Sequence, residues 1–151
     1  TTNQGTYTPT IDGDYLIKID QNLVQNFGWP VSSYGNHYDA VPINSYTKKF
    51  APLNKSHKKY GFIEPIKYFE NSLGISEIIQ NYYTNNSFFI TSLKNETIYE
   101  MQLDKNLNFV EIKDKTKLNE RIRDIIYDSQ NKCYLVYGES TPKLISMCPI
   151  N

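Results

Sequence analysis

The second half of the chain alternates apolar and polar residues over short stretches, which is the pattern of half-buried β-strands. The expected strands cover residues 74–80, 87–92, 97–103, 109–113, 123–127, 132–137 and 144–148. Turn-forming pairs such as Asn85-Asn86 and Lys94-Asn95 separate them. The first stretch is also compatible with the start of a helix, because Ile75-Ser76-Glu77-Ile78-Ile79 on its own does not distinguish the two. The pattern as a whole predicts up-and-down antiparallel strands.

The first half of the chain is less regular. Strands are expected at residues 14–19 and 62–69, the second at a sheet edge because Pro65 cannot donate a ladder hydrogen bond. Residues 20–61 between them have no sustained period and predict a long loop, which is usually functional or ordered by a ligand or partner. Both histidines, His37 and His57, fall in this loop. We interpret them as solvent-exposed, because no second ligand lies at metal-binding spacing.

Composition narrows the class of protein. The 151 residues suit one domain, and abundant tyrosine with few alanines favours an all-β fold. The net charge is zero and the charges are interspersed, which argues against a nucleic-acid-binding protein. No apolar run approaches the roughly 20 residues of a membrane span, so no membrane partner is expected. The N-terminus is polar and lacks a charged n-region, as in a mature secreted chain or a truncated one.

The two cysteines flank a predicted hairpin. If Tyr137 opposes Leu144 across the turn, the antiparallel register puts Cys133 directly opposite Cys148. Opposed residues are close enough for a disulfide only in the non-hydrogen-bonded kind of pair. We therefore hypothesise a cross-strand disulfide, with two buried free thiols as the alternative.

The expected strands form two successive groups, about 50 residues apart, each a simple meander. This repetition is typical of β-propeller blades. Because strand direction alternates, the turn between the second and third strands of a blade lies at the same end as the link to the next blade. Lys94 occupies such a turn, and Arg121 and Arg123 occupy such a link. The three cations are therefore expected at one end of adjacent blades.

Arg121 and Arg123 are the only arginines of the chain. Because Ile122 separates them, they share one face if the segment is extended. Their planar guanidinium groups suit bidentate contacts with carboxylate or phosphate. Together with Lys94 they point to a ligand with several anionic groups. The alternative is that the three are unrelated surface charges.

Five short motifs occur in an order that carries a family resemblance. They are Gly28-Trp29-Pro30, Ser33-Tyr34-Gly35, Pro65-Ile66-Lys67-Tyr68-Phe69, Ser92-Leu93-Lys94 and Arg121-Ile122-Arg123-Asp124. In this order they resemble the C-terminal portion of the soluble glucose and aldose sugar dehydrogenases that use pyrroloquinoline quinone (PQQ). The resemblance implies that residues 1–151 form the C-terminal part of a six-bladed β-propeller, comprising about two and a half four-stranded antiparallel blades.

The resemblance also implies roles for individual residues. Lys94, Arg121 and Arg123 would contact PQQ, which carries three carboxylates. Tyr68 and Phe69 would contact the sugar. A segment around Asp14 matches a stretch near the family's calcium site, which makes calcium a second candidate cofactor, although no metal ligand is assigned here. The family's catalytic histidine lies upstream of the matched region, so no catalytic residue is assigned in this chain.

The implied function is oxidation of an aldose at C1 to a lactone. The N-terminal remainder of the propeller, on the same or a separate chain, would be the partner. The implied location is periplasmic or secreted. The alternative function is a non-catalytic propeller module that binds an anionic ligand or a protein partner through its basic end.

Overall fold

A computed structural model describes residues 2–3, 10–11, 14–37 and 45–149 of the chain. The chain divides into two compact units, Thr1–Ser72 and Leu73–Asn151. Within the described ranges, no helix has both the length and the apolar character needed to cross a membrane.

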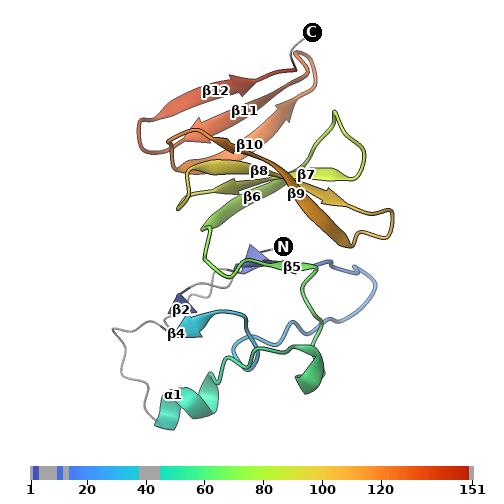
Figure 1. Ribbon diagram of the computed structural model, residues 1–151, viewed down its shortest axis with the longest axis vertical. Coiled ribbons are helices and arrows are strands. Elements are labelled where there is room, and N and C mark those ends of the chain that lie inside the picture. Colours follow the sequence, from blue (N-terminus) through green and yellow to red (C-terminus); the bar gives the residue numbers. More distant parts are fainter. Residues whose placement is uncertain (1, 4–9, 12–13, 38–44, 150–151) are drawn as a thin grey trace. The chain divides into compact units, whose positions relative to one another are not determined.

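The second unit contains two antiparallel sheets (Figure 1). The first sheet consists of β6 (Ile75–Gln80), β7 (Ser87–Ser92), β8 (Thr97–Leu103) and β9 (Phe109–Lys117). The second consists of β10 (Ile122–Asp128), β11 (Cys133–Gly138) and β12 (Lys143–Met147). In both sheets the strands are neighbours in sequence order, which confirms the predicted meanders. The segment that was also compatible with a helix start is a strand.

Strand β9 extends four residues beyond its predicted end at Lys113. The sequence Asp114-Lys115-Thr116-Lys117 has no apolar alternation, so the pattern could not reveal it. The backbone nevertheless continues to pair with β8, where Thr97 opposes Lys117. An edge strand keeps its ladder with polar side chains, because the hydrogen bonds are made by the main chain.

The core of the second unit lies between its two sheets. Tyr134 is fully buried there, and its hydroxyl donates a hydrogen bond to the carbonyl of Gln80 at 2.8 Å and accepts one from the amide of Tyr82 at 2.7 Å. These bonds satisfy a polar group that would otherwise be costly to bury. The buried apolar side chains of this core are Phe89, Ile98, Ile122, Ile125, Tyr134 and Val136.

The hairpin of β11 and β12 has the predicted register. Tyr137 opposes Leu144, and the ladder continues to Tyr134 opposite Met147. One position further, Cys133 and Cys148 form a disulfide with their Cα atoms 4.4 Å apart. The cross-strand disulfide is thus confirmed and the free-thiol alternative is wrong.

The first unit has only short elements. Its strands β1 (Thr2–Asn3), β3 (Tyr15–Leu16) and β5 (Lys67–Tyr68) form one sheet, and β2 (Thr10–Ile11) pairs with β4 (Asn36–His37). Residues 20–61 also contain α1 (Ser45–Phe50) and the 3-10 helix η1 (Lys58–Tyr60). Of the strand predicted at residues 14–19 only Tyr15–Leu16 forms, and of the strand predicted at residues 62–69 only Lys67–Tyr68 forms. The second of them is an edge strand, as Pro65 indicated.

The interpretation of His57 as solvent-exposed is wrong. Its side chain is fully buried, with Nδ1 2.9 Å from the carbonyl oxygen of Ile63. The turn at η1 folds the chain back, since the amide of Phe62 donates to the carbonyl of His57 at 3.0 Å. The imidazole stacks on the ring of Tyr34 with centroids 5.2 Å apart. The side chain of His37 lies outside the described part of the chain.

Candidate functional site

The link between β9 and β10 carries both arginines. Ile122 is completely buried in the core, whereas Arg121 and Arg123 on either side are exposed. The ladder between β10 and β11 is irregular between Ile122 and Asp124. Such an irregularity re-aims side chains at the end of a sheet. The segment therefore buries its isoleucine and presents its two guanidinium groups to solvent.

The turn between β11 and β12 holds this segment in place. The amide of Glu139 donates to the carbonyl of Arg121 at 2.8 Å, and the amide of Arg121 donates to Oγ of Ser140 at 3.2 Å. The carboxylate of Glu139 pairs with the guanidinium of Arg123 at 2.5 Å. Among the described residues, none forms an ion pair with Arg121. The turn thus fixes the backbone of one arginine and the side chain of the other.

Glu120 also holds the turn between β11 and β12 in place. Its side chain is 2% exposed and accepts hydrogen bonds from the hydroxyl and, at 3.2 Å, the amide of Thr141. The ammonium of Lys143 lies 2.9 Å from its Oε1. The hydrogen bond from Thr141, followed by the one from Lys143, lowers the pKa of Glu120 to about 2. A Cβ at Gly138 would lie 3.1 Å from Oε2 of Glu120, so glycine permits this close approach.

The pattern of the sequence did not reveal Glu120 as a structural carboxylate. Its partner Thr141 lies 21 positions further along the chain. The two come together only because β10, β11 and β12 fold into one sheet. A single glutamate in a polar link gives no local signal of burial.

Lys94 lies in the turn between β7 and β8. Its amide donates to the carbonyl of Leu73 at 3.0 Å, and the amide of Leu93 donates to the carbonyl of Gly74 at 2.9 Å. Gly74 has a positive φ of 61°, and a Cβ there would lie 3.3 Å from the amide nitrogen of Lys94. Glycine therefore allows the turn to pack closely on this backbone. The side chain of Lys94 is exposed.

The turn with Lys94 and the link with the arginines lie at the same end of the two sheets. The amide of Leu118 in the link donates to the carbonyl of Glu96 in the turn at 2.9 Å. Across the sheets, Oγ of Ser76 on β6 donates to the carbonyl of Ile122 on β10 at 2.6 Å. The structure therefore brings the two segments that carry the three cations to the same end of the sheets, as the meander predicted.

The two predicted sugar contacts lie in the first unit and differ from each other. Tyr68 is 42% exposed and stacks on Tyr34 with centroids 4.4 Å apart. Phe69 faces the ammonium of Lys67, which lies 5.6 Å from its ring centroid. Tyr68 lines a cleft of about 290 Å³, and Phe69 is not among the residues that line it. The lining residues are Tyr34, Asn36, Lys55, Tyr68 and Glu70.

Polar contacts hold the walls of this cleft. The hydroxyl of Tyr34 donates to Glu64 at 2.5 Å, and burial, followed by this bond, raises the pKa of Tyr34 to about 12. The ammonium of Lys55 donates to Oδ1 of Asn36 at 2.8 Å and to the carbonyls of Tyr34 at 3.2 Å and of Gly35. No sequence motif indicated Lys55, because its partners lie about 20 residues away in an irregular segment.

Candidate metal ligands are sparse. No group of three or more histidine, cysteine, aspartate or glutamate side chains within the described ranges could hold a metal ion. Asp14, from the segment that matches the calcium-site stretch, is buried and accepts a hydrogen bond from Oγ of Ser72 at 3.2 Å.

Two comparisons with known proteins both match this chain to sugar dehydrogenases. A family model described as Glucose / Sorbosone dehydrogenase matches residues 11–146. Aldose sugar dehydrogenase YliI of Escherichia coli K12 is 24% identical over 134 residues, which is 84% of this chain and 33% of that protein.

Two solved structures share the fold. The soluble aldose sugar dehydrogenase of Escherichia coli in its apo-form matches 99% of this chain with a TM-score of 0.72 and 21% identity. A glucose dehydrogenase also matches 99% with a TM-score of 0.70 and 21% identity. The chain covers 40% of the length of each structure and about a third of the curated relative. The expected fold, antiparallel blades of a β-propeller, is confirmed.

Proposed function

Because this chain belongs to the glucose/sorbosone dehydrogenase family, we propose that it is the C-terminal part of a PQQ-dependent sugar dehydrogenase. The complete enzyme would oxidise an aldose at C1 to a lactone. The observation that carries the proposal is that the turn with Lys94 lies next to the link with Arg121 and Arg123 at one end of two sheets. The rest of the propeller, on the same or a separate chain, would supply the catalytic base.

The three cations fit the chemistry of this cofactor. PQQ would supply a quinone that accepts the hydride of the sugar, and its three carboxylates need cationic partners. Arg121 offers a guanidinium that no described residue pairs with, and Glu139 holds the guanidinium of Arg123 in one orientation. Lys94 adds a point charge. An arginine beside the quinone oxygens would stabilise the negative charge that develops there.

Tyr68 and Phe69 are the proposed sugar contacts. Tyr68 is supported by its cleft, because an exposed aromatic ring next to the amide of Asn36 and the carboxylate of Glu70 suits a polyhydroxylated ring. Phe69 rests on the family resemblance alone. Calcium remains a candidate cofactor with no assigned ligand.

A periplasmic or secreted location is part of the proposal. The disulfide between Cys133 and Cys148 supports it, since such bonds persist in oxidising compartments.

A titration of the chain with PQQ, followed by the absorbance of the quinone, tests the cofactor assignment. The double variant R121A/R123A is expected to lose roughly hundredfold or more in affinity, because it removes two charge-assisted interactions that each contribute about 1.5–3 kcal/mol. The matched control is K105A, which removes an exposed lysine from the turn between β8 and β9. Equal affinity of the double variant and the wild type would refute the assignment.

The second candidate function is a non-catalytic module that binds an anionic ligand or a protein through the same basic end. The observation in its favour comes from residues 68–76, the run that corresponds to the sugar-binding segment of the resembled family. Phe69 stands there in place of that segment's tryptophan, and both of its prolines are absent. Citrate separates the two functions. Binding of citrate as tight as that of PQQ favours the module, and a strong preference for PQQ favours the dehydrogenase.

A further inference from the structure

Strand β6 is irregular near its beginning. Its ladder with β7 pairs Ile75 with Ser92 and Ile78 with Ile90, so two residues of β6 face one residue of β7 between these pairs. Such a bulge turns a side chain out of the regular alternation of the strand. Here it brings the hydroxyl of Ser76 to the neighbouring sheet.

The strand that this hydroxyl reaches, β10, is irregular at the same point. The ladder between β10 and β11 shifts between Ile122 and Asp124. Oγ of Ser76 donates a hydrogen bond of 2.6 Å to the carbonyl of Ile122. That carbonyl lies directly before Arg123 and one residue after Arg121. The two irregularities therefore meet in one hydrogen bond, and this bond holds the backbone from which both arginines project.

A second hydroxyl fixes the orientation of the first. Oγ1 of Thr91 lies 2.8 Å from Oγ of Ser76 and accepts a hydrogen bond from the amide of Glu77 at 3.0 Å. A hydroxyl has one proton, and that of Ser76 is directed to the carbonyl of Ile122, so Thr91 donates to Ser76. The other acceptor near Thr91, the carbonyl of Glu77, is more distant at 3.4 Å. The relay therefore runs from the amide of Glu77 through Thr91 and Ser76 to the arginine segment.

Thr91 also leads into the turn that carries Lys94. The side chain of Thr91 is completely buried, and Ser92 follows it in β7. Oγ of Ser92 accepts a hydrogen bond from the amide of Asn95 at 2.9 Å, which closes the turn around Lys94. The hydroxyl pair of Thr91 and Ser76 thus joins the strand that precedes Lys94 to the link with the arginines.

We propose that Ser76 is a positioning residue for the anion-binding end of the sheets. Its hydroxyl sets the place of the Ile122 carbonyl, and with it the direction in which both arginines leave the backbone. Their spacing from Lys94 is fixed by the same relay. A ligand with several carboxylates needs cations at fixed spacings, because charge-assisted hydrogen bonds depend on geometry. The proposal rests on the proposed function for its ligand, but the placement of the arginines can be measured without one.

Nitrogen-15 NMR of the chain at mildly acidic pH measures this placement. Arg121 and Arg123 are the only arginines, so the arginine Nε–Hε region holds two signals, and R121K assigns them by removing one. In S76A both signals are expected to shift, because the Ile122 carbonyl has lost its donor. S76T keeps the hydroxyl and should restore the wild-type positions. T91V removes only the donor to Ser76, so it should shift the signals less.

The matched control is S87A. Ser87 is completely buried at the start of β7, away from the turn with Lys94, and its hydroxyl donates to Oε1 of Glu100 at 2.9 Å. S87A is expected to lower the melting temperature as S76A does and to leave both arginine signals in place. The proposal is overturned if S76A leaves the signals in place, if S87A shifts them as much, or if S76T does not restore them.

Titrations with citrate and with PQQ extend the test to binding. S76A is expected to weaken the affinity for the tighter of the two about threefold to tenfold, which is the effect of one neutral hydrogen bond. The loss should be smaller in the R121A background, because Ser76 acts through the arginines. Equal losses in both backgrounds, or a wild type that binds neither compound, would overturn the anion-binding role. If citrate binds as tightly as PQQ, the dehydrogenase assignment fails, and the loss in S76A is expected all the same.

Discussion

Glu139 contacts both arginines at once. Its amide donates to the carbonyl of Arg121 at 2.8 Å, and its carboxylate pairs with the guanidinium of Arg123 at 2.5 Å. The pair is about half exposed, so its contribution to stability is small. Its main consequence is orientation and charge at the basic end of the sheets.

The first prediction concerns this carboxylate. In E139Q the amide oxygen can still accept a hydrogen bond from Arg123, but the charge that repels an anionic ligand is gone. Affinity for PQQ is expected to rise about threefold to tenfold at low salt, and the gain should shrink as salt screens the charges. E139A, which also removes the acceptor, should gain less. Weaker binding by E139Q at every salt concentration would contradict this view of Glu139.

The second prediction concerns acid stability. The pKa of Glu120 falls from its ordinary value of 4.5 to about 2 in the folded chain, through Thr141 and Lys143. The ionised carboxylate therefore stabilises the fold above pH 4.5, and this stabilisation is lost as the pH falls towards 2. Thermal unfolding at several pH values is expected to show E120Q below the wild type at pH 7 and converging with it near pH 2. A constant difference between the two would count against the prediction.

The third prediction concerns the disulfide. Cys133 and Cys148 are 15 residues apart, and a loop of that length contributes about 3 kcal/mol through the restricted unfolded chain. Urea unfolding of the double variant C133S/C148S should show a loss of this order. Treatment with an alkylating agent without reductant should leave the mass of the wild type unchanged. Addition of two labels under those conditions would be inconsistent with the bridge.

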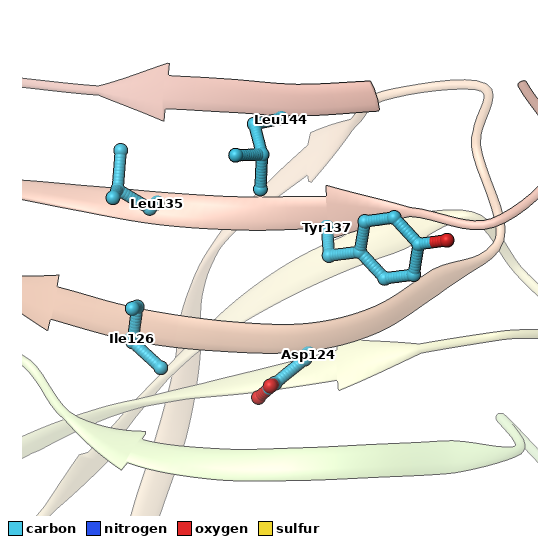
Figure 2. A pocket seen from close by; sticks show the side chains of 5 residues that line it. All are labelled: Asp124, Ile126, Leu135, Tyr137 and Leu144. Atoms are coloured by element: carbon cyan, nitrogen blue, oxygen red, sulfur yellow. The ribbon is translucent and has the colours of Figure 1, made fainter. Parts of the chain in front are cut away.

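The fourth prediction compares two neighbours on β10. Ile125 is 2% exposed in the core between the sheets, whereas the next residue, Ile126, is 54% exposed (Figure 2). In the isolated chain, I125A is expected to lower the free energy of unfolding by about 2–5 kcal/mol. I126A should change it by less than about 1 kcal/mol, because little of its side chain is buried. Equal losses in the two variants would contradict this difference in burial.

The sequence predicted the second unit better than the first. Alternation is local, and turn pairs such as Lys94-Asn95 end each strand, so β6 to β12 were located within a few residues. The disulfide could be hypothesised because one pairing is enough to set the register of a short hairpin. In the first unit, strands of two residues have no period to detect. Their positions depend on contacts between segments far apart in the chain.

By itself, the sequence determined the antiparallel meanders and the identity of the family. These properties depend on short periods of apolar residues, on side-chain type and on the order of motifs along the chain. Only the tertiary structure decided that Glu120 is buried, that His57 is covered, and that Glu139 holds Arg123. Burial and ion pairing depend on which distant segments meet, and a local sequence pattern does not show which residues will be neighbours in space.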